Sequence, residues 1–131
     1  MLLREGRRQG AQHMVVTHAI HSPIFMSVPE MQEAAKQGAF IELSAERPPS
    51  FKGGGAKDAA EYAARIDKVA DAIRKVGPEF CILSSDLGQG GNPVPTDGLA
   101  GFVVALRNKG FTQQELDRVT KQNPAGLLGL P

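Results

Sequence analysis

The stretch FCILSSDLGQGGNP, residues 80–93, decides the fold, because a short apolar run ends close to an aspartate and leads into a glycine-rich loop. Phe80–Leu83 is apolar throughout, which predicts a strand buried on both faces, as in a parallel sheet. In such sheets ligands bind at the carboxyl ends of the strands. Asp86 therefore has two interpretations, an active-site carboxylate or a residue that only ends a strand.

Two further short runs, MVVT (14–17) and FIEL (40–43), have a similar character and predict two more strands. Helical signals lie between and after the three runs. They are capping-box spacings, apolar residues at helical spacing, and glycine or proline where a helix should end. The predicted helices are Met1–Arg8, one from Ser27 to Gly38, one from Asp58 to Gly77, one from Thr96 or Asp97 to Lys109, one after Thr112 and a last turn capped by Asn123.

This order of elements, α-β-α-β-α-β-α-α, is typical of parallel strands joined by right-handed crossovers. We therefore expect a single α/β domain over residues 1–131, with three parallel strands, crossover helices and extra C-terminal helices. Two longer loops, 47–56 and 87–95, should follow the second and third strands at the carboxyl edge. Their glycines match neither a dinucleotide-binding fingerprint nor a P-loop.

Composition argues against several classes of partner. Fifteen Lys and Arg residues balance 14 Asp and Glu residues, a net charge of +1, so we expect neither nucleic-acid nor membrane-surface binding. No export signal and no long apolar segment is evident, which predicts a soluble, cytoplasmic protein. Cys81 is the only cysteine, which excludes an intramolecular disulfide and a zinc site built of cysteines, and its apolar neighbours predict a place in the core.

Each predicted strand carries a polar group at or near its carboxyl end. These groups are His18, Glu42 and Asp86. Imidazole and carboxylate suit zinc or a similar divalent ion, and a metal-held water needs a nearby carboxylate to take its proton. His18 and Asp86 would suit these roles, although from the residues alone a histidine after a strand is more often structural and an aspartate there is commonly a helix cap or turn former.

Other polar residues near the strand ends have weaker signals. His21 is predicted to be a solvated loop histidine. Glu42, between two apolar neighbours, is predicted to pair with a lysine or arginine, with a metal-ligand role as the alternative. His13 precedes the first strand and belongs to the opposite edge of the sheet.

Four segments together resemble the C-terminal part of TIM-barrel metal-dependent hydrolases of the amidohydrolase superfamily, and most of all a cytosolic amidohydrolase-like branch. The resemblance extends over most of the chain. The segments are VVTHA (15–19), FIELS (40–44), SSDLGQGGNPVPTDGLAGFVVAL (84–106) and NPAGLLGLP (123–131).

The resemblance implies a partial (β/α)8 barrel that contains strands six, seven and eight. It implies that His18 is a metal ligand or substrate contact, and that Asp86 binds a divalent metal, zinc or manganese, and acts as general base. It also implies substrate contacts from the loops, with Gln89 and Glu42 as candidates. A small molecule with a carbonyl or phosphoryl centre would be the substrate.

The superfamily's metal ligands on the first, fourth and fifth strands have no counterpart in this sequence. A whole barrel has about 250 residues, so the chain would be a barrel fragment, and two ligands predict little activity for the isolated chain. Exposed sheet edges would favour a homo-oligomer. Two alternatives stay open, a non-catalytic oligomeric module or split-barrel subunit, and a truncated reading frame.

Overall fold

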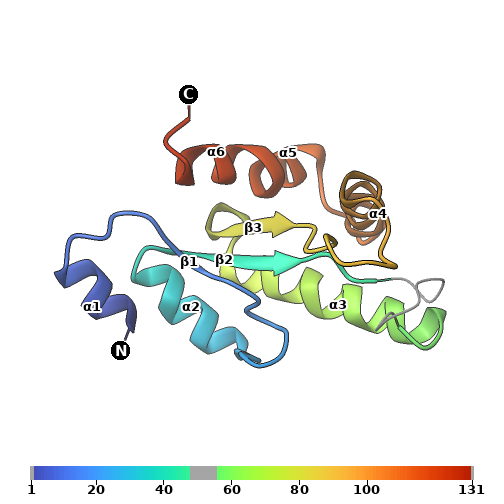
Figure 1. The fold of residues 1–131 in the computed structure, drawn as a ribbon, viewed down its shortest axis with the longest axis horizontal. Helices are drawn as coiled ribbons and strands as arrows, with labels where there is room; N and C mark the ends of the chain where they lie inside the picture. Colours follow the sequence, from blue (N-terminus) through green and yellow to red (C-terminus); the bar gives the residue numbers. More distant parts are fainter. Residues whose placement is uncertain (1, 48–55, 131) are drawn as a thin grey trace.

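The computed structural model describes residues 2–47 and 56–130, and the predicted loop 47–56 therefore lies mostly outside the described residues. Within them the sheet has three strands, β1 (Met14–Val16), β2 (Ala39–Ser44) and β3 (Cys81–Ser84), in the order β1-β2-β3. Both pairings are parallel (Figure 1). The predicted mixed α/β fold with a parallel sheet is confirmed, and the strand ends differ from the prediction by about one residue.

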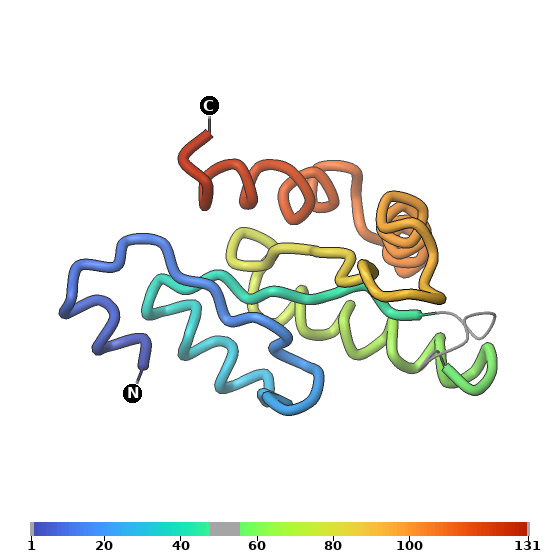
Figure 2. The backbone as a smooth tube through the Cα atoms, viewed as in Figure 1, coloured from blue at the N-terminus to red at the C-terminus, as the bar shows by residue number. Residues whose placement is uncertain are grey.

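The helices follow the predicted order. Because the strands follow one another in sequence across the sheet, the crossover helices α2 and α3 lie on the same side of it, as the chain path in Figure 2 shows. The C-terminal helices lie beyond β3. The bounds are α1 Leu2–Arg8, α2 Val28–Lys36, α3 Ala59–Val76, η1 Pro78–Phe80, α4 Pro95–Asn108, α5 Gln113–Asp117, the π-helical segment η2 Arg118–Gln122 and α6 Asn123–Leu127.

One face of the sheet forms the core. Ile41 and Leu43 of β2 are fully buried, and they belong to one cluster with residues of β3 and of the helices, including Met31, Ile66, Val69, Ile73, Cys81, Leu83, Phe102, Leu106, Leu116 and Val119. The alternate residues of β2, Phe40 and Glu42, lie on the other face and are only half-buried. The sheet therefore has a helix-covered face and a more open face.

Cys81 lies in this core, as predicted, and is fully buried. Burial, with a smaller contribution from the negative charge of Glu79, raises the pKa of the Cys81 thiol to about 12. The thiol is therefore protonated at neutral pH and cannot act as a nucleophile.

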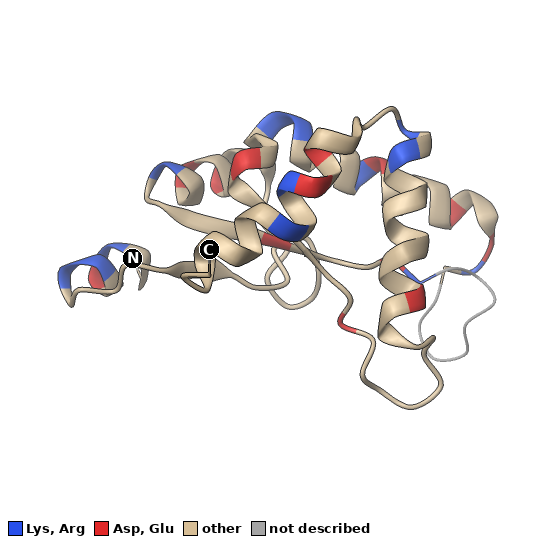
Figure 3. Cartoon of the chain, turned by 90° about the horizontal axis from the view of Figure 1, so that it is seen from above, with Lys and Arg blue, Asp and Glu red and all other residues tan. Residues whose placement is uncertain are grey.

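The surface carries mixed charge. In Figure 3 basic and acidic residues are interspersed along the helices. Among the described residues no helix is both long and apolar enough to cross a membrane.

Several helix starts agree with the predicted caps. The carboxylate of Asp58 accepts the Glu61 amide at 2.8 Å at the start of α3. At the start of α5 the Thr112 amide donates to Glu115 at 2.8 Å, and the Glu115 amide donates back to the Thr112 hydroxyl at 3.2 Å. These reciprocal bonds satisfy backbone donors that the first turn of a helix leaves unpaired.

Two predicted caps are wrong. The cap of α4 is Val94 rather than Thr96 or Asp97, because Pro95 with its preset φ occupies the first helical position. Asn123 is not an N-cap, since it is the first residue of α6, its backbone is helical and the chain is already helical through η2. Its buried amide instead donates to the Pro78 and Cys81 carbonyls, both at 2.7 Å.

Replacing Asn123 with alanine should destabilise the protein by about 1–3 kcal/mol, because the Pro78 carbonyl of η1 and the Cys81 carbonyl of β3 lose the side-chain amide that donates to both. Urea unfolding followed by circular dichroism would measure the loss. Asn108→Ala at the exposed end of α4 is the matched control and should change stability by less than about 0.5 kcal/mol. Equal effects of the two substitutions would contradict the anchoring role.

Candidate functional site

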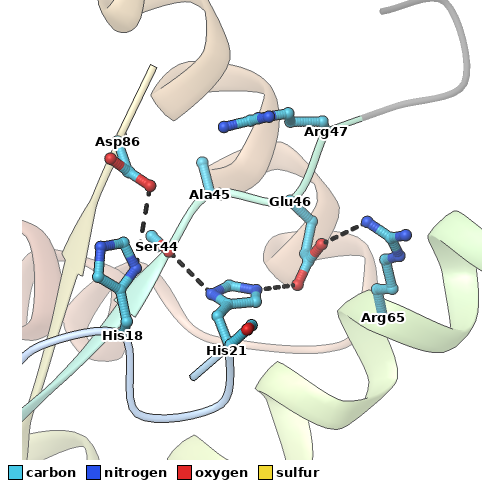
Figure 4. A pocket seen from close by; sticks show the side chains of 9 residues that line it. His18, His21, Ser44, Ala45, Glu46, Arg47, Arg65 and Asp86 are labelled. Carbon is cyan, nitrogen blue, oxygen red and sulfur yellow. Dashed lines mark hydrogen bonds and ion pairs between the residues drawn. The ribbon is translucent and has the colours of Figure 1, made fainter. Parts of the chain in front are cut away.

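A cavity of about 280 Å³ lies at the carboxyl edge of the sheet, where the polar strand-end residues were expected to meet. Figure 4 shows that its side chains come from the loop after β1, from the end of β2, from the segment after β3 and from α3. The residues include His18, His21, Ser44, Glu46, Arg65 and Asp86. This edge is where ligands bind in parallel α/β sheets.

His18 and Asp86 are brought together in this cavity. His18 Nδ1 lies 3.9 Å from Asp86 Oδ2, and both side chains are more than one-third exposed. Strands β1 and β3 are separated by β2, so their axes are roughly 10 Å apart. The contact therefore requires both side chains to lean across the end of β2.

Both residues have left-handed backbone conformations, with φ of 56° at His18 and 47° at Asp86. Such a conformation is unfavourable for a residue with a side chain and costs roughly 1–3 kcal/mol. Strained backbones of this kind are concentrated at functional sites.

Glu42 supports the turn that carries His18. Its Oε2 accepts the His18 amide at 3.3 Å, and its backbone carbonyl accepts the amide of the fully buried Ala19, also at 3.3 Å. The expected pairing of Glu42 with a lysine or arginine is therefore replaced by a bond to the backbone, because the carboxylate lies beside the end of β1.

Gln89 connects Asp86 to its loop. The Gln89 amide nitrogen lies 3.4 Å from Asp86 Oδ1, and Gln89 Oε1 accepts from Arg47 at 3.4 Å and from the Asn92 amide. Asp86 Oδ2 is thus the oxygen that faces His18. The side chain of Gln89 is exposed and is not among the residues that line the cavity.

His21 is not the solvated residue that the sequence suggested. It is half-buried, with Nδ1 at 3.0 Å from Ser44 Oγ and Nε2 at 2.7 Å from Glu46 Oε1. Sequence reasoning missed Ser44 and Glu46 as its partners. One signal was present, because Glu42, Ser44 and Glu46 alternate along an extended segment and so tend to share one face.

Glu46 is a buried carboxylate with a basic partner. Its side chain is 6% exposed, its Oε2 lies 3.4 Å from Arg65, and Arg65 also contacts Glu61 at 2.9 Å. Burial and, second, the negative charge of Glu46 raise the pKa of nearby Tyr62. The pairing with Arg65 compensates the loss of water around Glu46.

The donors of His18 and Asp86 fit two positions around one metal ion. Zinc donors about 2.1 Å from the ion, at tetrahedral angles, lie about 3.4 Å apart, so a small side-chain movement from 3.9 Å would bring both into place. In the described part of the chain, no group of three or more His, Cys, Asp or Glu residues is arranged to hold a metal. Further ligands would have to come from outside these residues.

No protein-family model and no curated protein matches the sequence. Among solved structures, the chain is similar to the β-aspartyl dipeptidase of the thermophilic, keratin-degrading Fervidobacterium islandicum AW-1 in complex with a β-Asp-Leu dipeptide. The TM-score is 0.56 at 20% sequence identity, and the match covers 91% of this chain. The chain spans 30% of that protein. At this identity the similarity shows the fold alone.

Replacing Glu42 with leucine should accelerate hydrogen exchange of the His18 amide by about fivefold, because a hydrogen bond worth about 1 kcal/mol is lost. Glu42→Gln keeps an acceptor and should exchange more slowly than the leucine variant. Glu33→Leu on the exposed surface of α2 controls for the change in charge. NMR of the individual amides would measure the exchange rates. An unchanged rate for the His18 amide in Glu42→Leu would show that Glu42 does not stabilise the turn that carries His18.

Proposed function

We propose that this chain is the C-terminal part of a (β/α)8 barrel hydrolase of the amidohydrolase type, with β1 to β3 as strands six to eight. The meeting of His18 and Asp86 across the end of β2 carries this proposal. Sequential parallel strands, crossover helices on one side and a more open opposite face support it, since they are what a segment of such a barrel would have. The fold similarity to a dipeptidase supports it as well.

His18 and Asp86 would hold a divalent ion, zinc or manganese. When bound, the ion would supply a Lewis acid and lower the pKa of a water molecule. Asp86 is the general base that takes the proton of the attacking water, and its Oδ2 faces the cavity beside His18. The water oxygen would add to a carbonyl or phosphoryl centre of a small substrate, the bond to the leaving group would break, and the leaving group would take the proton from Asp86.

The remaining predicted residues have supporting roles in this proposal. Gln89 holds Asp86 Oδ1 and, with its exposed side chain, is the candidate substrate contact of the loop after β3. Glu42 acts through His18, whose backbone it stabilises, and is therefore a positioning residue rather than a substrate contact. Two donors are fewer than the three protein ligands of a usual catalytic zinc site, so activity requires ligands from other residues.

A second candidate function is that of a non-catalytic homo-oligomeric module or a split-barrel subunit. The observation that favours it is the more open face of the sheet, where Phe40 is only half-buried, together with the outer edge of β1. Unpaired strand edges are templates for pairing with another chain. Under this proposal a second chain covers the open face.

Titration with zinc and with manganese tests the first proposal. The wild type should bind about one ion per chain, and Asp86→Asn and His18→Ala should each weaken binding at least about tenfold, because each removes a ligand. Asp97→Asn, an exposed carboxylate outside the cavity, is the matched control and should bind as the wild type does. Equal affinity in all four proteins would contradict the metal site, and light scattering of the same samples would test self-association.

A further inference from the structure

The inner half of the cavity contains a second constellation that the metal proposal does not use. Ser44 is the last residue of β2, His21 lies in the loop after β1, and Glu46 follows β2 by two residues. The Ser44 hydroxyl lies 3.0 Å from His21 Nδ1, and His21 Nε2 lies 2.7 Å from Glu46 (Figure 4). These are a hydroxyl, an imidazole and a carboxylate in a row.

The carboxylate of Glu46 determines which atom donates and which accepts in each hydrogen bond of this row. Glu46 faces the guanidinium of Arg65 at 3.4 Å, and a carboxylate in such a pair acts as a hydrogen-bond acceptor. His21 Nε2 therefore carries the proton that it donates to Glu46. In the neutral ring Nδ1 is then the acceptor, and the Ser44 hydroxyl donates to it.

This is the arrangement by which a base activates a serine and a third group orients the base. Compared with the serine proteases, the two ring nitrogens exchange roles, because Nδ1 rather than Nε2 faces the serine. Glu46 keeps the ring in the tautomer that can accept the hydroxyl proton and stabilises the imidazolium that forms.

The surroundings of Ser44 suit a small acyl substrate. Ser44 lines the cavity but is only 3% exposed, so it lies at the floor, and a volume of about 280 Å³ admits only a small molecule. Arg47 lines the same cavity, and its positive charge favours a negative oxygen there. Ser84, the partner of Ser44 in the register of β2 and β3, has no such imidazole partner among the described residues.

We propose that Ser44, His21 and Glu46 form a metal-independent unit that hydrolyses short-chain carboxylic esters through an acyl-serine intermediate. This activity does not rest on the metal site proposed above. Ser44 Oγ bonds to the ester carbonyl carbon while its proton moves to His21 Nδ1. The ester C–O bond then breaks, and the alcohol leaves with the proton from His21.

The second half of the reaction restores the enzyme. Water adds to the acyl carbon and gives a proton to His21 Nδ1. The bond between Ser44 Oγ and the acyl carbon breaks, Ser44 regains a proton from His21, and the carboxylic acid leaves. Ester and water are thus converted into alcohol and acid, and the reaction needs no other reactant.

The test is hydrolysis of p-nitrophenyl acetate in the presence of EDTA, with peptide mapping after reaction with a fluorophosphonate probe. The wild type should turn over the ester and carry the probe on Ser44. Ser44→Ala should lose the probe and at least about tenfold of the rate, and Glu46→Gln should lose at least about tenfold of the rate. Ser84→Ala is the matched control and should retain both labelling and rate.

Thermal unfolding of each variant would establish that it is folded before the rates are compared. A wild-type rate equal to that of Ser44→Ala, or a probe found elsewhere than on Ser44, would overturn the proposal. Ester hydrolysis that EDTA abolishes would also overturn it. None of these results bears on zinc or manganese affinity, so the two proposals fail separately.

Discussion

The parallel pairing of β2 with strands on both of its sides is the constraint on which the rest of the structure depends. Parallel strands need crossovers, so a helix must return the chain to the amino edge after each strand. All three carboxyl ends therefore open at one edge, and segments that are far apart in sequence meet there. The backbone topology alone therefore brings together the segments that surround the cavity.

Within the cavity the polar residues divide into two parts with different bonding. His18 and Asp86 are partly exposed and lie 3.9 Å apart, a separation that leaves both groups able to take another partner. His21 and Glu46 are joined at 2.7 Å, and Glu46 is nearly buried. The outer pair is thus suited to binding something from solution, and the inner pair is suited to holding protons in set positions.

Local signals in the sequence predicted much of the fold and part of the site. Buried strands, the caps at Asp58 and Thr112, and the meeting of His18 with Asp86 follow from short-range patterns and from the topology they imply. The roles of His21 and Asn123 could not be predicted in this way. Their partners come from distant segments of the chain. The local sequence around a polar residue in a loop or beside a proline is the same whether its side chain faces water or bonds to a buried group.

The positive φ angles at His18 and Asp86 lower the stability of the protein at the two positions whose side chains the proposed metal site needs. Glycine could adopt both conformations without strain, so a stability screen of this chain would be expected to favour glycine at these two positions. Each such gain would remove an imidazole or a carboxylate from the rim of the cavity. Selection for thermostability alone would therefore mislead the engineering of this protein, because it would favour variants that have lost the side chain of His18 or Asp86.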